Sequence, residues 1–295
     1  MLLNSDEDNN IALDRYEAML KSNRVIFFDS NEFENIIHYY LDNGKLNKAK
    51  KAVALGLSQH PSSVNLRLLE VEILVFDEKL DEAEKLLNTI QNLEPENEEV
   101  YIQKASIYSK KNDHTKAIEF LKFALSFSQE PADIHALLGM EYLFMDDFEH
   151  AKKHFSECLK LDPNDYSSLY NTINCFNFLE QTDEAIEFIN EYLETNPYCE
   201  VAWHQLGKQY QSKKDLKKAL AAFDFAIISD DTFVGAYIEK GKILEKLKRY
   251  NEAIENYSIT LELEDPTSFA LLRIGKCFEK LKNKEKALYL SLIHI

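Results

Sequence analysis

Two histidines four residues apart give the sequence its best spacing for a metal site. His150 and His154 would share one face of a helix, and imidazole is a common zinc ligand. No third ligand stands nearby, and Lys152 and Lys153 lie between the two histidines. We therefore expect a solvated helix face here and predict neither a metal nor a cofactor.

Two acidic pairs, Asp146-Asp147 and Asp230-Asp231, have the chemistry of general acids or bases. Each pair falls between two expected helices, where aspartate more often caps a helix end, so we interpret both as caps. The sequence contains no GxxxxGK[ST], HExxH, GxSxG or GxGxxG motif. We interpret Trp203 as a packing residue rather than a platform for a ligand, and predict that the chain is not an enzyme.

Composition excludes several classes of protein. The 295 residues carry 51 acidic and 34 basic side chains, a formal net charge of −17. This argues against a nucleic-acid partner, because binding phosphates requires a cationic face. Seven glycines and six prolines favour helices joined by short turns. The four cysteines lack a CxxC spacing, so we expect reduced thiols.

Neither a membrane span nor a secretory signal is visible in the sequence. No apolar run approaches the length that crosses a bilayer. The first ten residues lack the basic and apolar regions of a signal peptide. We therefore predict a cytoplasmic protein with no membrane partner. Its richness in Lys, Asn, Ile, Tyr and Phe is typical of an AT-rich genome, and we expect a bacterial source.

Alanine recurs every 34 residues along most of the chain. The eight alanines are Ala49, Ala83, Ala117, Ala151, Ala185, Ala219, Ala253 and Ala287. They define a frame whose repeats start at residues 30, 64, 98, 132, 166, 200, 234 and 268. The prolines lie at or near the junctions between these repeats, where proline can end one helix or open the next.

Within a repeat the apolar residues follow helical spacing. In residues 200–233 they stand three or four positions apart, on a first helix and then on a second: Trp203, Leu206, Gly207, Tyr210, Leu216, Ala219, Phe223 and Ala226. Small residues at positions 8 and 20 of the repeat would let two helices approach closely. A single helix pair cannot cover its own apolar face, so the pattern predicts stacked pairs.

This pattern, W-x2-L-G-x2-Y…A-x3-F-x2-A…P, resembles the tetratricopeptide repeat (TPR). The resemblance covers the chain from Ser30 to about Leu290 and is weakest in the repeat that starts at Val64. It implies an all-α fold, a right-handed α-α superhelix of about eight 34-residue helix-turn-helix repeats with the last one incomplete. Such a TPR solenoid implies protein partners, but it says little about which ones.

The two ends of the chain depart from the repeat. We expect residues 1–29 to form a capping segment with a short helix that starts at Asp8-Asn9-Asn10 and covers the first repeat. Residues 30–295 are expected to form the solenoid. The last repeat carries Ser291 where an aromatic residue is expected. We therefore expect that the natural protein continues and that its own sequence replaces the last five residues.

In a TPR array, the first helix of each repeat lines the concave groove, mainly through positions 2, 5, 6, 9 and 12. In the last four repeats we expect these positions to bind an extended partner segment. The predicted groove residues are Tyr170, Asn171, Asn174, Asn177, His204, Gln205, Lys208, Gln211, Lys242, Arg273 and Lys276. Amide side chains can hydrogen-bond a peptide backbone, and three aligned lysines can hold carboxylates of an acidic partner. A solvated helix face is the alternative.

Repeats 2–4 give the same helix positions a more apolar character. These residues are Leu68, Leu69, Ile102, Ala136, Leu137, Met140 and Leu143. They predict either a second contact zone or packing within the array. No three successive repeats carry the pattern of TPR domains that clamp chaperone C-termini. The sequence thus predicts an interaction scaffold or, alternatively, the regulatory or recruiting arm of a larger protein with its effector domain elsewhere.

Overall fold

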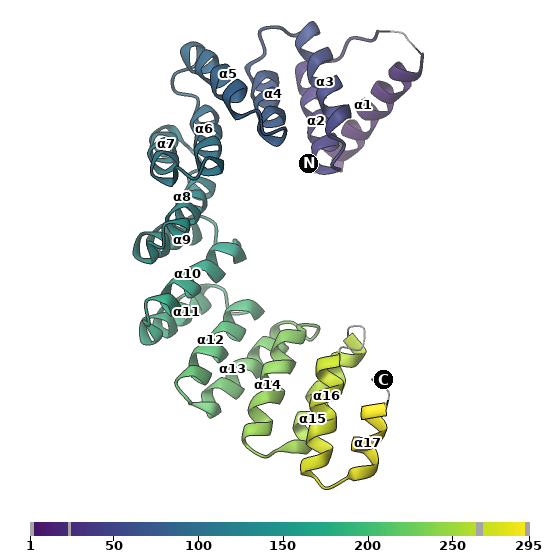
Figure 1. The fold of residues 1–295 in the computed structure, drawn as a ribbon, viewed down its shortest axis with the longest axis vertical. Coiled ribbons are helices and arrows are strands. Elements are labelled where there is room, and N and C mark those ends of the chain that lie inside the picture. The colour runs from purple at the N-terminus through teal and green to yellow at the C-terminus, as the bar shows by residue number, and fades with distance from the viewer. Residues whose placement is uncertain (1–2, 23–24, 264–267, 293–295) are drawn as a thin grey trace. The chain divides into compact units, whose positions relative to one another are not determined.

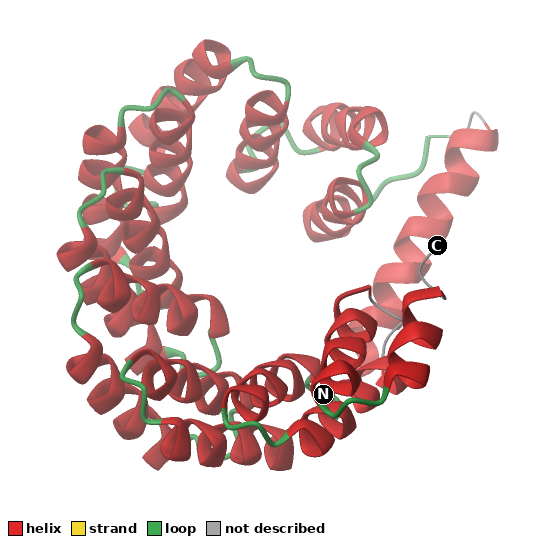
Figure 2. Ribbon diagram, turned by 60° about the horizontal axis from the view of Figure 1, so that its bottom comes forward, coloured by secondary structure: helices red, strands yellow, loops and turns green. Residues whose placement is uncertain are grey.

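The computed structural model describes residues 3–22, 25–263 and 268–292. Within these ranges the chain consists of helices joined by short loops and turns (Figures 1 and 2), and no strand occurs there. The helices fall into two compact units, Met1–Asp147 and Phe148–Ile295. The prediction of an all-α fold built from helix pairs is confirmed. None of the helices in the described ranges is long and apolar enough to cross a membrane.

The first unit holds eight helices in its described part. They are α1 (Leu3–Ser22), α2 (Ser30–Asp42), α3 (Leu46–Gln59), α4 (Val64–Phe76), α5 (Leu80–Leu93), α6 (Glu98–Lys110), α7 (His114–Phe127) and α8 (Ala132–Phe144). From α2 to α7 they pack as consecutive pairs, and each pair contacts the next.

The second unit continues the same order of helices. They are α9 (Phe148–Leu161), α10 (Tyr166–Phe178), α11 (Thr182–Thr195), α12 (Glu200–Ser212), α13 (Leu216–Ser229), α14 (Val234–Lys246), α15 (Tyr250–Leu263), α16 (Ser268–Lys280) and α17 (Lys284–Leu292). In both units the even-numbered helices from α2 onward begin at the residues where the 34-residue frame begins. The spacing of the alanines therefore marks the real ends of the helices.

The helices of a pair meet closely because the residues between them are small. Seven of the eight recurring alanines are fully buried, and Ala287 is 6% exposed. Gly207 on α12 lies directly against the ring of Phe223 on α13, and a Cβ atom at Gly207 would stand 2.6 Å from Phe223 Cε1. Gly241 and Tyr257 repeat this arrangement between α14 and α15, also at 2.6 Å. The small residues thus set the distance between paired helices.

One residue in each turn between paired helices has a left-handed backbone. In the first pair it is Gly44, with a φ of 65°, which glycine adopts without strain. At the positions 34 residues apart that follow, φ lies between 56° and 63°, although none of these residues is glycine: Glu78, Asn112, Asp146, Glu180, Lys214, Lys248 and Lys282. The geometry of the turn therefore overrides the ordinary preference of non-glycine residues for a right-handed backbone.

Successive pairs are joined by a hydrogen bond that recurs at one place in the frame. The fourth residue of a repeat donates to the backbone carbonyl six residues earlier. Trp203 Nε1 donates to Pro197 at 2.8 Å, and the Tyr101 hydroxyl donates to Pro95 at 2.7 Å. Trp203 also stacks on Phe225 with ring centroids 4.6 Å apart. Trp203 thus packs within the fold and holds a junction, in keeping with its predicted role.

The N-terminal helix differs from the expected one. Helix α1 begins at Leu3, so the expectation that Asp8-Asn9-Asn10 start it is wrong. Tyr16 and Met19 are buried in one cluster with Phe28, which precedes the first repeat, and with Phe33 of that repeat. This packing explains why the helix forms there. Residues 293–295 and Pro266 lie outside the described ranges, and the expectation about the last five residues stays a prediction.

Candidate functional site

The side chains with the strongest potential for chemistry are the histidines, carboxylates and cysteines of the described ranges. No group of three or more His, Cys, Asp or Glu there is placed to hold a metal ion. All four cysteines are free and buried. Burial raises the pKa of Cys158, Cys175 and Cys277 to about 11. These thiols therefore stay protonated at neutral pH and are poor nucleophiles.

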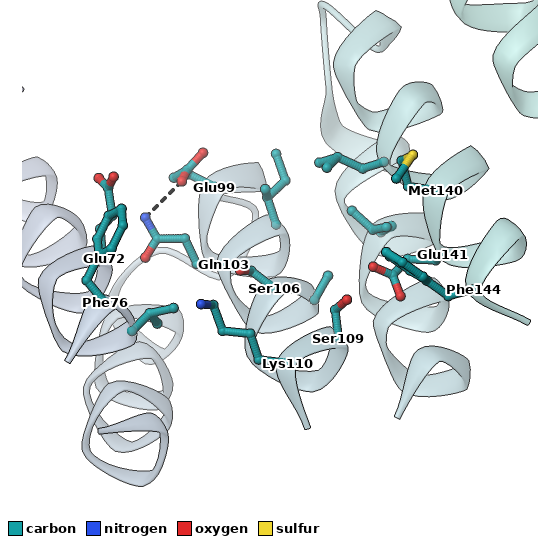
Figure 3. A pocket seen from close by; sticks show the side chains of 15 residues that line it. Glu72, Phe76, Glu99, Gln103, Ser106, Ser109, Lys110, Met140, Glu141 and Phe144 are labelled. Carbon is teal, nitrogen blue, oxygen red and sulfur yellow. Dashed lines mark hydrogen bonds between the residues drawn. The ribbon is translucent and has the colours of Figure 1, made fainter. Parts of the chain in front are cut away.

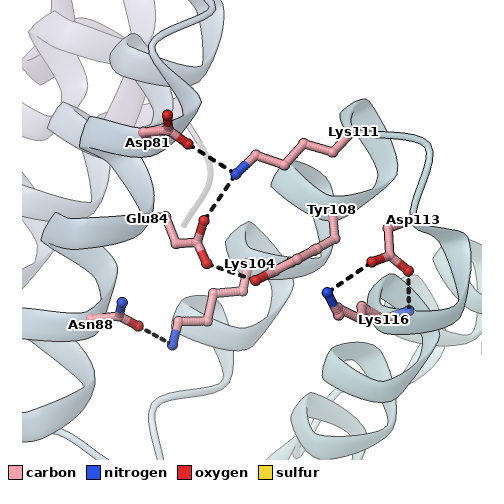
Figure 4. Close-up of polar contacts among 8 residues, drawn as sticks. All are labelled: Asp81, Glu84, Asn88, Lys104, Tyr108, Lys111, Asp113 and Lys116. Atoms are coloured by element: carbon pink, nitrogen blue, oxygen red, sulfur yellow. Dashed lines mark hydrogen bonds and ion pairs between the residues drawn. The ribbon is translucent and has the colours of Figure 1, made fainter.

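A buried lysine on α6 is held by polar partners rather than poised for catalysis. Lys104 is only 5% exposed, and burial lowers the pKa of its ammonium group. Its Nζ donates to Asn88 at 2.7 Å (Figure 4) and to Gln91 at 2.6 Å, both on α5. Nearby, the Tyr108 hydroxyl donates to Glu84 at 2.7 Å. This network joins α5 to α6 and gives Lys104 a structural role.

The predicted groove residues on α10 are partly open to solvent. Tyr170 is 46% exposed, and Asn177 is also exposed. Asn177 Oδ1 accepts a hydrogen bond from Gln209 Nε2 at 3.0 Å, which links α10 to α12. Asn171 and Asn174 are half-buried. This row therefore includes amides at the surface, but one of them already bridges two repeats.

On α12 the predicted residues differ sharply in exposure. Gln205 is 4% exposed and is part of the packed interior rather than an open surface. His204 lies between the rings of Phe223 and Phe233, at centroid distances of 5.6 and 5.3 Å. Burial, with a smaller effect from Lys208, lowers the pKa of His204 to about 4. His204 is consequently neutral at pH 7, while Lys208 is exposed.

A pocket of about 370 Å³ lies on α12, α14 and α16. Its lining brings together three of the predicted residues, Gln211, Lys242 and Arg273. Glu245, Lys246 and Phe269 complete the lining. Of these, Lys246 falls outside the five groove positions of the repeat, so the sequence pattern missed it. The exposed Lys276 does not line this pocket.

Two glutamates, Glu245 in the lining of this pocket and Glu239 outside it, already pair with two of its cations. Lys242 Nζ lies 2.7 Å from Glu239 Oε1, and 5.4 Å from the ring centroid of Phe269. Arg273 Nε lies 2.8 Å from Glu245 Oε1. With Lys246, the pocket and these partners carry three positive and two negative charges. The site is thus locally positive in a strongly acidic chain.

A larger pocket of about 680 Å³ lies in the first unit, on α4, α6, α7 and α8 (Figure 3). Ile102, Leu137 and Met140, three of the predicted apolar residues, line it. Leu68 and Leu69 are each 6% exposed and belong to the cores between helices. The apolar positions of repeats 2–4 therefore divide between an open pocket and internal packing.

The surroundings of two carboxyl groups in the larger pocket raise their pKa values. Burial raises the pKa of Glu72, with Asp42 raising it further and His38 opposing the shift. Burial also raises the pKa of Glu99, and the charges of Glu72 and Glu98 add to the effect. Gln103 Nε2 donates to Glu99 Oε1 at 2.8 Å and opposes this shift. No ion pair to Glu72 or Glu99 is found within the described ranges.

Models of known protein families match most of the chain. The model of the second ARM domain of tetratricopeptide repeat protein 21 matches residues 81–229, about half of the chain. Two models of the tetratricopeptide repeat match residues 234–258 and 269–290. The predicted resemblance and the family models thus agree on the kind of repeat.

Several curated proteins are similar in sequence to part of this chain. Anaphase-promoting complex subunit 3 of Schizosaccharomyces pombe is 24% identical over 140 residues, 48% of this chain and 21% of that protein. Cilia- and flagella-associated protein 70 of Homo sapiens is 23% identical over 197 residues, 63% of this chain and 18% of that protein. The chain spans about a fifth or less of the length of the curated relatives it matches. These relatives are eukaryotic, so a bacterial source stays a prediction.

The fold has a solved counterpart as well. The C-terminal part of a TPR repeat-containing protein from Cytophaga hutchinsonii superposes with a TM-score of 0.58 at 14% identity. The match covers 76% of this chain and 92% of that one. At this identity the likeness concerns the fold alone.

Proposed function

Because the chain belongs to the tetratricopeptide repeat family, we propose that it is a non-enzymatic protein-interaction scaffold whose second unit binds a carboxylate-bearing segment of a partner. The observation that carries the proposal is the pocket on α12, α14 and α16, where Lys242, Lys246 and Arg273 converge. A chain of net charge −17 repels acidic partners at long range. A locally positive pocket therefore marks where such a partner is accepted.

The pocket also contains the other groups that a peptide needs. The Gln211 amide can donate to a backbone carbonyl and accept from a backbone N–H. Phe269 is 37% exposed and offers an apolar surface beside the cations. A partner carboxylate would compete with Glu239 and Glu245 for Lys242 and Arg273. No ion pair to Lys246 is found among the described residues that pair with Lys242 and Arg273, so Lys246 gives the partner its first contact.

One row of equivalent positions on α10, α12, α14 and α16 extends this proposal. Asn174, Lys208 and Lys276 occupy the same position of successive repeats as Lys242. A partner segment following that row would pass from amide side chains on α10 to cations on the later helices. We propose that the partner is a protein rather than nucleic acid or membrane, and that binding takes place in the cytoplasm.

The length of the relatives favours a second candidate. Each curated relative is several times longer than the segment that matches this chain. A helical arm that recruits substrates or regulators to a larger protein would use the same groove. In that case the pocket on α12, α14 and α16 serves an attached or associated effector.

A selected peptide tests the charge requirement directly. Random extended peptides displayed on phage are selected on the full chain, and the enriched peptides are synthesised with a fluorescent label. We expect enrichment of Asp and Glu. In fluorescence anisotropy, Lys242→Gln/Lys246→Gln should weaken binding by about tenfold, equivalent to about 1.4 kcal/mol.

A matched control removes the same charge from the inter-helix turns. The variant Lys214→Gln/Lys248→Gln neutralises two exposed lysines in these turns. The same turn position carries Glu78 and Glu180 in other repeats, so the turn does not require a lysine there. Binding to this control should stay close to that of wild type. Equal weakening by both variants, or selected peptides without acidic residues, would refute the proposed site.

A further inference from the structure

The large pocket of the first unit has a chemistry opposite to that of the proposed site. Its lining is mostly apolar and includes Val75, Ile102, Leu121, Leu137 and Met140. Phe76 and Phe144 stand at opposite sides of it (Figure 3) and are 59% and 57% exposed. Aromatic side chains exposed beside a hollow of this size are typical of a surface that a partner covers.

The charged groups around this pocket are predominantly acidic. Glu72, Glu99 and Glu141 line it, against one cation, Lys110. Glu141 is already paired with His114 at 2.8 Å. Glu72 and Glu99 form no ion pair within the described ranges, although the charge of His38 lowers the pKa of Glu72, and both carboxyl groups are partly removed from water. A cation brought by a ligand would therefore find two carboxylates that no ion pair neutralises.

Gln103 lies between these carboxylates and the apolar lining. Its Nε2 donates to Glu99, while its Oε1 is buried without a hydrogen-bond partner within the described ranges. A buried acceptor without a donor is unfavourable. A ligand that brought an N–H group to this side of the pocket, with a small rotation of Gln103, would satisfy it.

We propose that this pocket is a second docking site, which takes a basic amphipathic segment of a partner protein. The segment would insert bulky apolar side chains between Phe76 and Phe144. It would place a lysine or arginine beside Glu72 and Glu99. Because an acidic segment is repelled here and attracted on α12, α14 and α16, the two sites select different partner segments.

Charge argues against the other occupants. A second copy of this chain also carries a net charge of −17, and the apolar face of its lysine-rich helix α3 is already buried in the core of the first repeat. Nucleic acid would meet carboxylates rather than cations. An uncharged apolar ligand would leave Glu72 and Glu99 buried without compensation, at a cost in affinity.

Three labelled synthetic peptides test the proposal with the full chain. They form amphipathic helices with the same leucine face and carry Lys, Gln or Glu on the polar face. In fluorescence anisotropy at physiological salt, we expect the Lys peptide to bind about tenfold more tightly than the Gln peptide. The Glu peptide should bind most weakly.

Variants separate this pocket from general attraction to an acidic protein. Glu72→Gln/Glu99→Gln should abolish the preference for Lys over Gln. The control Glu119→Gln/Glu130→Gln removes the same charge at exposed residues outside the pocket lining and should keep the preference. Loss of the preference in both variants, or in neither, would overturn the proposed role of the two carboxylates.

The apolar part of the site has its own test. Leu137→Ser/Met140→Ser changes residues that are 40% and 37% exposed, so folding should survive. We expect binding of all three peptides to weaken by about tenfold. If this variant melts early, Phe76→Ala gives the same test at a more exposed residue. Unchanged binding of the Lys peptide to a folded variant would overturn the pocket as its site. Neither result bears on the acidic peptides selected by the second unit.

Discussion

Replacement of Gly207 by alanine tests the packing logic of the repeat. Alanine is the better helix former, and in an open helix this change would stabilise the protein by up to about 1 kcal/mol. At Gly207, however, the new Cβ would lie 2.6, 2.7 and 2.8 Å from three ring atoms of Phe223. Ordinary carbon contacts lie at about 3.5 Å or more, so the ring and the methyl group must separate by about 1 Å.

Phe223 has little room for that movement. Its side chain is fully buried in a cluster with Ala219 and Ile243. Overpacking in such a core costs about 1–3 kcal/mol, which exceeds the gain in helix propensity. We therefore expect Gly207→Ala to lower the free energy of unfolding by about 1–2 kcal/mol.

Urea unfolding followed by far-UV circular dichroism measures this difference. Gly235→Ala is the matched control, because the nearest atom to its new Cβ would lie at an ordinary 3.5 Å. The control should be neutral or slightly stabilising. Phe223→Leu should relieve the clash, so the double variant should be less destabilised than the sum of the two single variants. A Gly207→Ala protein as stable as wild type would refute the proposed close packing.

Three further predictions concern the turns, the acidic pocket and the repeat junctions. Both Lys214 and Gly44 have a left-handed backbone, which glycine adopts with less strain than other residues. Lys214→Gly should therefore raise the free energy of unfolding by about 0.5–1 kcal/mol, and Gly44→Ala should lower it by a similar amount. Thermal melts measure both changes. The pKa of Glu99 is raised in the folded protein, so the folded state favours the protonated carboxyl group. Ionisation of Glu99 as the pH rises therefore lowers the free energy of unfolding. Glu99→Gln should thus stabilise the protein at pH 7 in urea titrations, with the gain disappearing below about pH 4. Trp203→Phe loses the hydrogen bond to the Pro197 carbonyl and should cost about 1 kcal/mol in the same titration, whereas no loss would deny that bond a structural role.

The repeat frame was predictable because packing imposes it on the sequence. A large side chain at Ala219 or Gly207 would force paired helices apart, so these positions keep small residues and reveal the period. The turns were less visible. Seven left-handed residues are Glu, Asn, Asp or Lys rather than glycine, and residue types this common on helix surfaces give no sign of a left-handed backbone. Likewise, nothing in the run Asp8-Asn9-Asn10 distinguishes a helix cap from the interior of α1.

The candidate sites were harder to predict than the helices. Groove positions follow from the repeat, but exposure depends on the neighbouring helices. Gln205 is buried while Lys208, three residues later, is exposed. The repeat pattern also does not predict which charged side chains form ion pairs with each other. The ion pair between Arg273 and Glu245 joins residues 28 positions apart on adjacent repeats, so it emerges only when the repeats are stacked.

These pairings determine how each site can discriminate between partners. On α14 and α16 the cations are already balanced in part, so a partner carboxylate exchanges one ion pair for another and gains little energy at Lys242 or Arg273. Discrimination there depends on Lys246 and should weaken at high salt, because this lysine is exposed. In the first unit the situation is reversed. Glu72 and Glu99 bear the cost of burial without an ion pair. A basic partner relieves this cost in a partly dehydrated pocket, where salt screens less. High salt should therefore abolish the preference of the pocket on α12, α14 and α16 for acidic peptides. At the same salt concentration, the larger pocket of the first unit should still prefer basic peptides.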